Sequence, residues 1–155
     1  MERELDHARV IAPPPLIMLA AVGAGFLLRL AWHTPLLGNP WRWPAAGGCL
    51  AVALLLSGSA VHEMRRARTS IIPHHSTTAL VTSGPFRLTR NPLYVSLALV
   101  LASAGFAADS LAVLAMIVPW AVVMRFGVIA REENYLSRKF GEDYRAYCRR
   151  ARRWL

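Results

Sequence analysis

Four stretches of this sequence are apolar and almost free of charge, and they constrain the fold more than any other feature. They cover residues 16–32, 43–61, 92–108 and 110–130, while charged residues gather in the segments between and after them. A helix that spans the hydrocarbon core of a bilayer needs about 20 mostly apolar residues, with about 17 as the lower limit. The pattern therefore predicts four membrane-spanning helices, the last of which keeps Arg125 near its end.

The composition argues against a soluble domain. Hydrophobic residues make up 55% of the 155 residues and charged residues 17%, whereas an average soluble domain has about 25% charged residues. A soluble chain of this length would have too few residues left to cover four apolar helices. We therefore expect one all-α, integral membrane bundle over residues 1–155, with a cytoplasmic loop at 62–91 and an amphipathic C-terminal helix at 131–150.

The positive charges are distributed asymmetrically across the predicted membrane. Outside the apolar segments, two Lys or Arg residues lie in the N-terminal arm, five in the 62–90 loop and nine from Arg125 onward, whereas the opposite side carries only Arg42. Cytoplasmic segments of membrane proteins are enriched in Lys and Arg. Both termini are therefore expected to be cytoplasmic, at the inner membrane if the protein is bacterial. The N-terminal arm mixes acidic and basic residues, so we expect no cleavable signal peptide.

The net charge of +9 would also fit a nucleic-acid-binding protein. The sequence has neither zinc-finger spacing nor the aromatic motif of RNA-binding domains, so we expect no nucleic-acid partner. His62, His74 and His75 share one loop without a nearby Asp or Cys, so no metal site is expected. Cys49 and Cys148 are expected on opposite sides of the membrane, which argues against a disulfide.

A turn followed by a helix start forms one candidate site. Residues 83–94 read SGPFRLTRNPLY, in which Pro92 suits the first turn of a helix capped by Asn91. The free backbone N–H groups of that turn, beside Arg87 and Arg90, could bind an anion. A capped helix with arginines that reach toward the headgroups would give the same pattern, and the local sequence leaves both interpretations open.

Two adjacent carboxylates, Glu132 and Glu133, form a second candidate site at the end of the fourth apolar helix. They could be solvated charges paired with arginines, or they could bind a cationic ligand or the hydroxyl and amino groups of a ligand. In the charged helix that follows, apolar residues recur at intervals of three to five, and Gly141 allows a break. This pattern fits either a helix that lies on anionic lipid or a lid over a site at the membrane face.

Together the two clusters resemble the isoprenylcysteine carboxyl methyltransferase and phospholipid methyltransferase family of integral membrane enzymes. The resemblance covers roughly residues 71–154. The matching residues are Leu80-Val81-Thr82, the run from Gly84 to Tyr94, then Glu132-Glu133, Leu136, Phe140-Gly141, Tyr144 and Tyr147.

The resemblance implies S-adenosylmethionine as cofactor and methylation of an amphiphilic acceptor, isoprenoid-like or lipid-like, at the cytoplasmic membrane face. The implied cofactor-binding residues are Gly84, Pro85, Asn91, Pro92, Tyr94, Glu132 and Glu133. For catalysis, Arg87 or Arg90 would orient a carboxylate acceptor, with Arg125 as a further candidate. An amine acceptor would instead be deprotonated by Glu133 or Glu132. The sequence does not decide between a carboxylate and an amine as the acceptor.

Two positions depart from the family pattern. Many members have His where this chain has Asn91, and Gly where it has Ser96. Asparagine keeps a hydrogen-bond donor but lacks a titratable ring, which puts an acid–base role at that position in question. The alternative function is therefore a non-catalytic membrane subunit or small carrier that retains the fold. The acidic pair argues against it, because nothing in the fold requires two carboxylates there.

Overall fold

The computed structural model describes residues 10–32, 35–36, 40–70 and 77–154. Over these residues it is helical and contains no strand longer than an isolated bridge, which confirms the predicted all-α class. The helices are α1 (Pro14–Ala31), α2 (Arg42–Arg66), α3 (Pro92–Ala107), α4 (Leu111–Ala115), α5 (Ile117–Met124) and α6 (Ala130–Arg150), with a 3₁₀ turn η2 (Gly84–Arg87) and a π-helical turn η3 (Arg125–Ile129).

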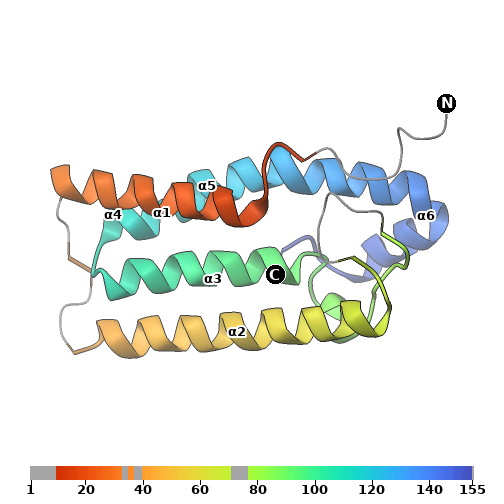
Figure 1. The fold of residues 1–155 in the computed structure, drawn as a ribbon, viewed down its shortest axis with the longest axis horizontal. Helices are drawn as coiled ribbons and strands as arrows, with labels where there is room; N and C mark the ends of the chain where they lie inside the picture. Colours follow the sequence, from red (N-terminus) through yellow and green to blue (C-terminus); the bar gives the residue numbers. More distant parts are fainter. Residues whose placement is uncertain (1–9, 33–34, 37–39, 71–76, 155) are drawn as a thin grey trace.

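The helices form a bundle suited to a membrane. α3 lies in the middle, with α2 along one side and α1, α4 and α5 along the other (Figure 1). Within the described residues, three helical segments are long and apolar enough to cross a bilayer, namely Pro14–Ala31, Arg42–Arg66 and the continuous run Leu111–Arg150. α3 has 16 residues, just below the usual length limit. It nevertheless runs alongside α2 between the two ends of the bundle (Figure 1).

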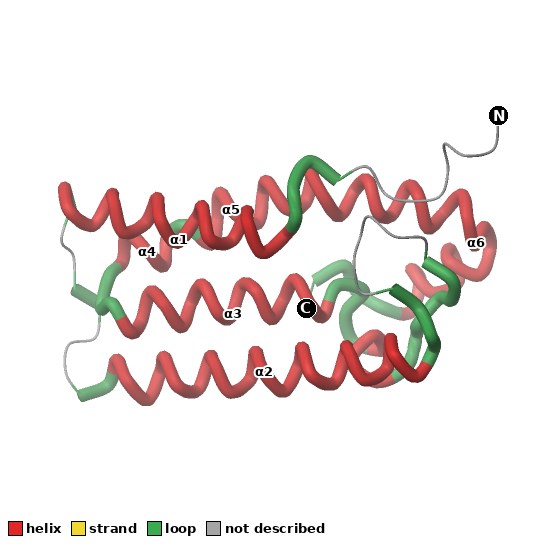
Figure 2. The backbone as a smooth tube through the Cα atoms, viewed as in Figure 1, coloured by secondary structure: helices red, strands yellow, loops and turns green. Residues whose placement is uncertain are grey.

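The segments that join the helices lie at two opposite ends of the bundle. The end of α1, the start of α2, the end of α3 and the start of α4 lie at one end, and the end of α2 lies at the other end together with α6 and the chain that follows it (Figure 2). α2 continues to Arg66 rather than ending at residue 61, so the polar segment between α2 and α3 is shorter than the predicted 62–91 loop. Both candidate clusters consequently lie at the same end of the bundle.

Small residues allow α2 to lie close against α3. Ala46, Ala53 and Ala60 repeat every seven residues, which places them on one face of α2, and all three are buried. The hydroxyl of Ser103 in α3 donates a hydrogen bond to the carbonyl of Ala46 at 2.8 Å. Close approach through small residues is the usual basis of helix packing in lipid, and it fixes α3 in the centre of the bundle.

The segment predicted as one helix over 110–130 is divided in the structure. α4 ends at Ala115, α5 follows after Met116, and the chain then passes through η3 into α6. Pro119 explains the first break, because a proline lacks the N–H group for the helical hydrogen bond and its ring crowds the carbonyl four residues earlier, here that of Ala115. Ser110 caps the start of α4 by accepting a hydrogen bond from the amide of Val113.

Candidate functional site

A cavity opens at the end of the bundle where α2, α3 and α6 meet. Most of the surface of its walls is apolar, as is usual for a small-molecule site, although many of the lining residues also carry a polar group. The apolar lining includes Met64, Leu80, Val81, Phe86, Leu93 and Leu136. The polar lining includes Thr69, Ser70, Thr77, Arg90, Asn91, Tyr94, Glu132, Glu133, Tyr135, Tyr144 and Tyr147.

The structure brings the two sequence clusters together around this cavity. Six of the predicted site residues line it, namely Arg90, Asn91, Pro92, Tyr94, Glu132 and Glu133. The hydroxyl of Tyr94 donates a hydrogen bond to Oε1 of Glu132 at 2.6 Å, which joins the first turn of α3 to the first turn of α6. The tyrosine and the acidic pair, 38 residues apart in the chain, therefore belong to one site.

Three predicted site residues lie outside the cavity lining. Gly84 has a φ of +56°, and a Cβ added to it would lie 2.7 Å from Cγ of Glu63 in α2. The hydroxyl of Ser83 donates a hydrogen bond to the same Glu63 side chain. Pro85 is buried in the turn, and Arg87 is exposed. The position of this turn indicates that it anchors the α2–α3 segment to the end of α2.

Asn91 precedes α3 but does not cap it with its side chain. Its Nδ2 instead donates a hydrogen bond to the carbonyl oxygen of Arg153 at 2.8 Å. Its backbone N–H donates to the hydroxyl of Thr89 at 3.2 Å. One side-chain donor of Asn91 is therefore used within the protein.

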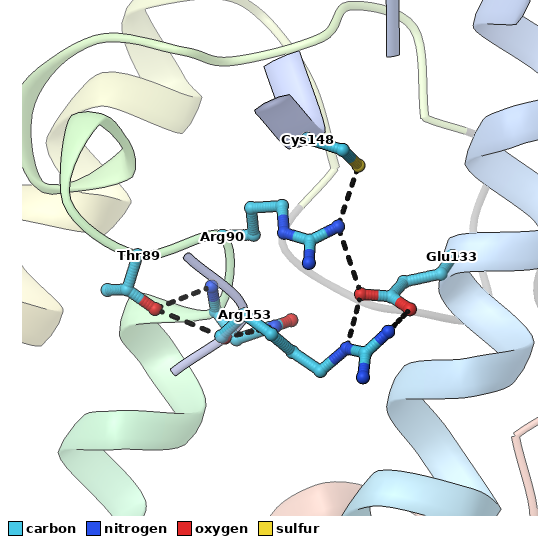
Figure 3. Close-up of polar contacts among 6 residues, drawn as sticks. Thr89, Arg90, Glu133, Cys148 and Arg153 are labelled. Carbon is cyan, nitrogen blue, oxygen red and sulfur yellow. Dashed lines mark hydrogen bonds and ion pairs between the residues drawn. The ribbon is translucent and has the colours of Figure 1, made fainter. Parts of the chain in front are cut away.

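Glu133 is held by two arginines. Nη1 of Arg90 lies 3.2 Å from Oε1 of Glu133, and Arg153 donates from Nε to Oε1 at 2.9 Å and from Nη2 to Oε2 at 2.8 Å (Figure 3). The hydrogen bonds to Glu133 raise the pKa of the Arg153 guanidinium above its usual value. The side chain of Glu133 is 18% exposed, so these partners offset much of the cost of removing a carboxylate from water.

Arg153 was not among the predicted site residues. It follows the end of α6 by three positions and lies twenty residues from its partner Glu133, so no helical spacing links the two. The pairing arises because the bend of α6 at Gly141 brings the end of the chain back toward the start of this helix. Arg90 has a further contact, a hydrogen bond from Nη1 to Sγ of Cys148 at 2.6 Å.

The segment Ala151–Trp154, named here the C-terminal strap, runs alongside the residues before α3. The amide of Arg90 donates to the carbonyl of Arg152 at 2.8 Å, and the amide of Arg152 donates to the carbonyl of Leu88 at 3.3 Å. The indole of Trp154 packs edge-on against that of Trp120, with 6.2 Å between the ring centroids. The strap therefore adds a short parallel bridge to the wall of the site.

α6 closes the site because it bends. Gly141 has a φ of +53°, which interrupts the helix as the sequence allowed, and the second half of α6 turns back toward α2 (Figure 1). This bend brings Tyr144 and Tyr147 to the cavity, where both are buried. The hydroxyl of Tyr147 donates to the carbonyl of Phe86 at 2.7 Å. Of the two arrangements that the amphipathic pattern left open, the structure has α6 packed over the site.

Candidate metal ligands do not gather in the described part of the chain. It contains no group of three or more His, Cys, Asp or Glu side chains that could hold a metal ion. His62 belongs to α2, while His74 and His75 lie outside the described residues.

A profile of the phospholipid methyltransferase family matches residues 41–143. The chain belongs to this family. Membership confirms the resemblance found in the sequence and, together with the apolar helices, indicates a membrane methyltransferase. The matched range includes α2, α3 and the acidic pair, and it ends before Tyr144 and the C-terminal strap.

Two relatives share part of this sequence. An uncharacterized protein of Haemophilus influenzae is 47% identical over 64 residues, which are 41% of this chain and 100% of that protein. The cobalt-zinc-cadmium resistance protein CzcN of Cupriavidus metallidurans is 38% identical over 79 residues, which are 51% of this chain and 36% of that protein. The match thus spans about a third of the length of the second relative. No solved structure matches the chain significantly.

Proposed function

We propose that this protein transfers a methyl group from S-adenosylmethionine to an amphiphilic, isoprenoid-like or lipid-like acceptor at the cytoplasmic face of the membrane. The observation that carries the proposal is the hydrogen bond between Tyr94 and Glu132, because it unites the two motifs that the family resemblance assigns to cofactor binding. Both motifs line one cavity with apolar walls, as an amphiphilic acceptor requires.

The side chains present in the cavity fit the chemistry of this cofactor. S-adenosylmethionine supplies an electrophilic methyl group on a cationic sulfonium, together with ribose hydroxyls, an amino acid group and a flat base. The Glu132 carboxylate can accept hydrogen bonds from hydroxyl and ammonium groups. The side chains of Phe86, Leu93 and Leu136 offer an apolar surface to a base.

The walls have to separate to admit a ligand of that size. The cavity has a volume of about 140 Å³, and typical small-molecule sites measure about 300–1,000 Å³. The Tyr94–Glu132 hydrogen bond joins two lining residues on opposite helices. Separation of the walls would therefore stretch this hydrogen bond.

The contacts of the charged residues favour Glu132 over Glu133 as a proton acceptor. Both carboxylate oxygens of Glu133 are already occupied by Arg90 and Arg153, which leaves them less available to a substrate. Glu132 accepts a hydrogen bond from the neutral Tyr94 hydroxyl and lines the cavity. An amine acceptor could therefore lose its proton to Glu132, while the apolar walls exclude water and hold the reacting groups in place.

A carboxylate acceptor finds less support. Of the three arginines considered for it, Arg87 and Arg125 are exposed and outside the cavity lining. Arg125 lies over the ring of Phe126, 5.6 Å from its centroid. Arg90 does line the cavity but is already paired with Glu133, so a carboxylate acceptor would have to share its guanidinium.

The cytoplasmic location rests on charge and on the aromatic residues at the other end of the bundle. The site lies at the end that carries the α2–α3 segment and the basic residues after α6 (Figure 1). Trp32, Trp41 and Trp43 are exposed around the α1–α2 connection, and Arg42 lies over the ring of Trp43. Tryptophans gather at membrane–water interfaces, which supports a second interface at that end.

One observation favours the alternative of a non-catalytic subunit or carrier. One of the two N–H groups of Asn91 Nδ2 is bound to the Arg153 carbonyl, so this position offers no titratable group and only part of its donor capacity to a ligand. Binding without transfer is the expected behaviour under this alternative.

Calorimetric binding of S-adenosylmethionine and S-adenosylhomocysteine to the full chain in detergent tests the proposal. Wild type should bind both, and Glu132→Gln should weaken binding at least tenfold. Glu142→Gln is the matched control, because Glu142 is exposed on the far part of α6 and pairs with Arg145 and Arg149. A folded wild type that binds neither compound contradicts the proposal. Binding without transfer of labelled methyl groups to a lipid extract supports the carrier alternative.

A further inference from the structure

One residue of the C-terminal strap contacts both walls of the cavity. The guanidinium of Arg153 binds both carboxylate oxygens of Glu133 in α6. Its carbonyl oxygen accepts a hydrogen bond from the hydroxyl of Thr89 at 3.3 Å (Figure 3). The same oxygen accepts a second hydrogen bond from Nδ2 of Asn91 at 2.8 Å, directly before α3. Arg153 thus connects the α3 wall to the α6 wall without lining the cavity itself.

The two sets of contacts depend on each other. A two-point guanidinium–carboxylate pair is stronger and more directional than a single ion pair. It holds Arg153 in the position from which its carbonyl accepts hydrogen bonds from Asn91 and Thr89. The flanking residues hold the strap in register, because Ala151 is buried and Trp154 packs on Trp120.

The charges around this pair leave Glu133 dependent on Arg153. Arg90 reaches Glu133 through one nitrogen only, at 3.2 Å, and that same nitrogen also contacts Cys148. Without Arg153, a carboxylate that is 18% exposed would keep a single shared donor. Turning toward water would lower the free energy of such a carboxylate, because water would replace its missing hydrogen-bond partner. This movement would carry the first turn of α6 away from α3.

We propose that Arg153 is a positioning residue that keeps the Asn91 wall and the Glu133 wall aligned with each other, so that both can contact S-adenosylmethionine once the cavity has opened. This inference rests on the proposed function for its ligand. The strap lies outside the residues matched by the family profile, so the assignment comes from the contacts in this chain alone.

The test compares Arg153→Gln with Arg152→Gln in the full chain in detergent. The two variants remove the same charge from neighbouring residues, but the side chain of Arg152 is exposed and makes no hydrogen bond or ion pair with the residues that the structure describes. Arg153→Gln should weaken S-adenosylhomocysteine binding by roughly tenfold or more, the loss expected when a charged hydrogen-bonded pair is broken. Arg152→Gln should stay within about twofold, as for a surface change.

Two further measurements separate positioning from simple stabilisation. In the double variant Glu133→Gln/Arg153→Gln, the loss of affinity should not exceed that of the larger single variant, because both act on one interaction. Hydrogen exchange at the amide of Arg90, which is bonded to the Arg152 carbonyl, should be faster in Arg153→Gln than in Arg152→Gln. Arg153→Lys, which keeps the charge but not the two-point geometry, should bind with intermediate affinity.

The result that overturns the inference is unchanged S-adenosylhomocysteine affinity in a folded Arg153→Gln protein. An equal loss in Arg152→Gln also overturns it, because general charge would then explain the effect. If wild type binds no S-adenosylhomocysteine, the proposed function fails. Hydrogen exchange at the Arg90 amide then tests by itself whether Arg153 holds the two walls. Faster exchange in Arg153→Gln then supports its role in holding the walls, and unchanged exchange contradicts it. If Arg153→Gln does not fold, the same comparison is made with Arg153→Lys.

Discussion

The hydroxyl of Tyr94 and the carboxylate of Glu132 lie 2.6 Å apart, although 38 residues separate them in the chain. The bond spans from α3, the central helix, to α6, the helix that packs over the cavity. It is the contact through which two local motifs become a single site. Each motif has an ordinary structural explanation when it is considered alone. The contact between the two motifs therefore says more about function than the sequence of either motif does.

Tyr94→Phe should lower stability, because it leaves the Glu132 carboxylate without its neutral donor. Loss of a hydrogen bond to a charged group costs about 1–3 kcal/mol. The expected result is a lower unfolding midpoint in detergent, measured by thermal or denaturant unfolding. In Tyr94→Phe/Glu132→Gln, the two losses should not add. Additive losses would mean that the two side chains do not interact in solution.

Arg90→Gln should reduce cofactor binding roughly tenfold, because Arg90 lines the cavity and pairs with Glu133. Arg87→Gln should leave binding within about twofold, as expected for an exposed side chain outside the cavity. Calorimetry with S-adenosylhomocysteine measures both. A comparable loss in the two variants would show that Arg87 takes part after all, as the sequence suggested.

Gly84→Ala should destabilise the protein, because alanine at a φ of +56° is strained and its Cβ would press on Glu63. The strain alone costs about 1–2 kcal/mol. Gly58→Ala is the matched control, since no atom lies within 4 Å of the added Cβ and alanine is favoured in a helix. Thermal unfolding should give a lower midpoint for the first variant and an equal or higher one for the second. The reverse order would contradict the anchoring role of the turn.

Glu133→Gln should lower stability, because it leaves Arg90 and Arg153 facing each other without the carboxylate between them. Breaking a partly buried pair from one side costs about 3 kcal/mol or less, depending on how far water can enter. Glu142→Gln should give no measurable change, since its ion pairs lie on the exposed surface. Unfolding in detergent compares the two, and equal effects would argue against a structural role for the Glu133 cluster.

The sequence was informative where a feature depends on local pattern. Apolar length predicted the helices, and α3 begins at Pro92, the first-turn position expected for that proline. Gly141 indicated the bend in α6. Pro119 indicates the break after α4, but the uniformly apolar sequence around it led to the prediction of a single helix.

The sequence was uninformative where a contact depends on the chain returning to an earlier element. The pairing of Arg153 with Glu133, and of its carbonyl with Asn91, requires the bend in α6 and the docking of Trp154 on Trp120. Neither the bend nor the docking of the two tryptophans follows from a fixed separation of residues in the sequence. The same limit applies to the partners of Glu133. The sequence left pairing with arginines as one of two interpretations, and the structure identifies the partners as Arg90 and Arg153.

The bend at Gly141 makes the protein sensitive to the length of the segment that follows it. Adding or removing one residue between Gly141 and Tyr147 would rotate the rest of the helix by about 100° and shift it by about 1.5 Å. Tyr144 and Tyr147 would then face away from the cavity, and the strap would meet Thr89 out of register. Insertions and deletions should therefore be far rarer in this stretch among related sequences than in the segment between α2 and η2, even though both lie at the polar end of the bundle.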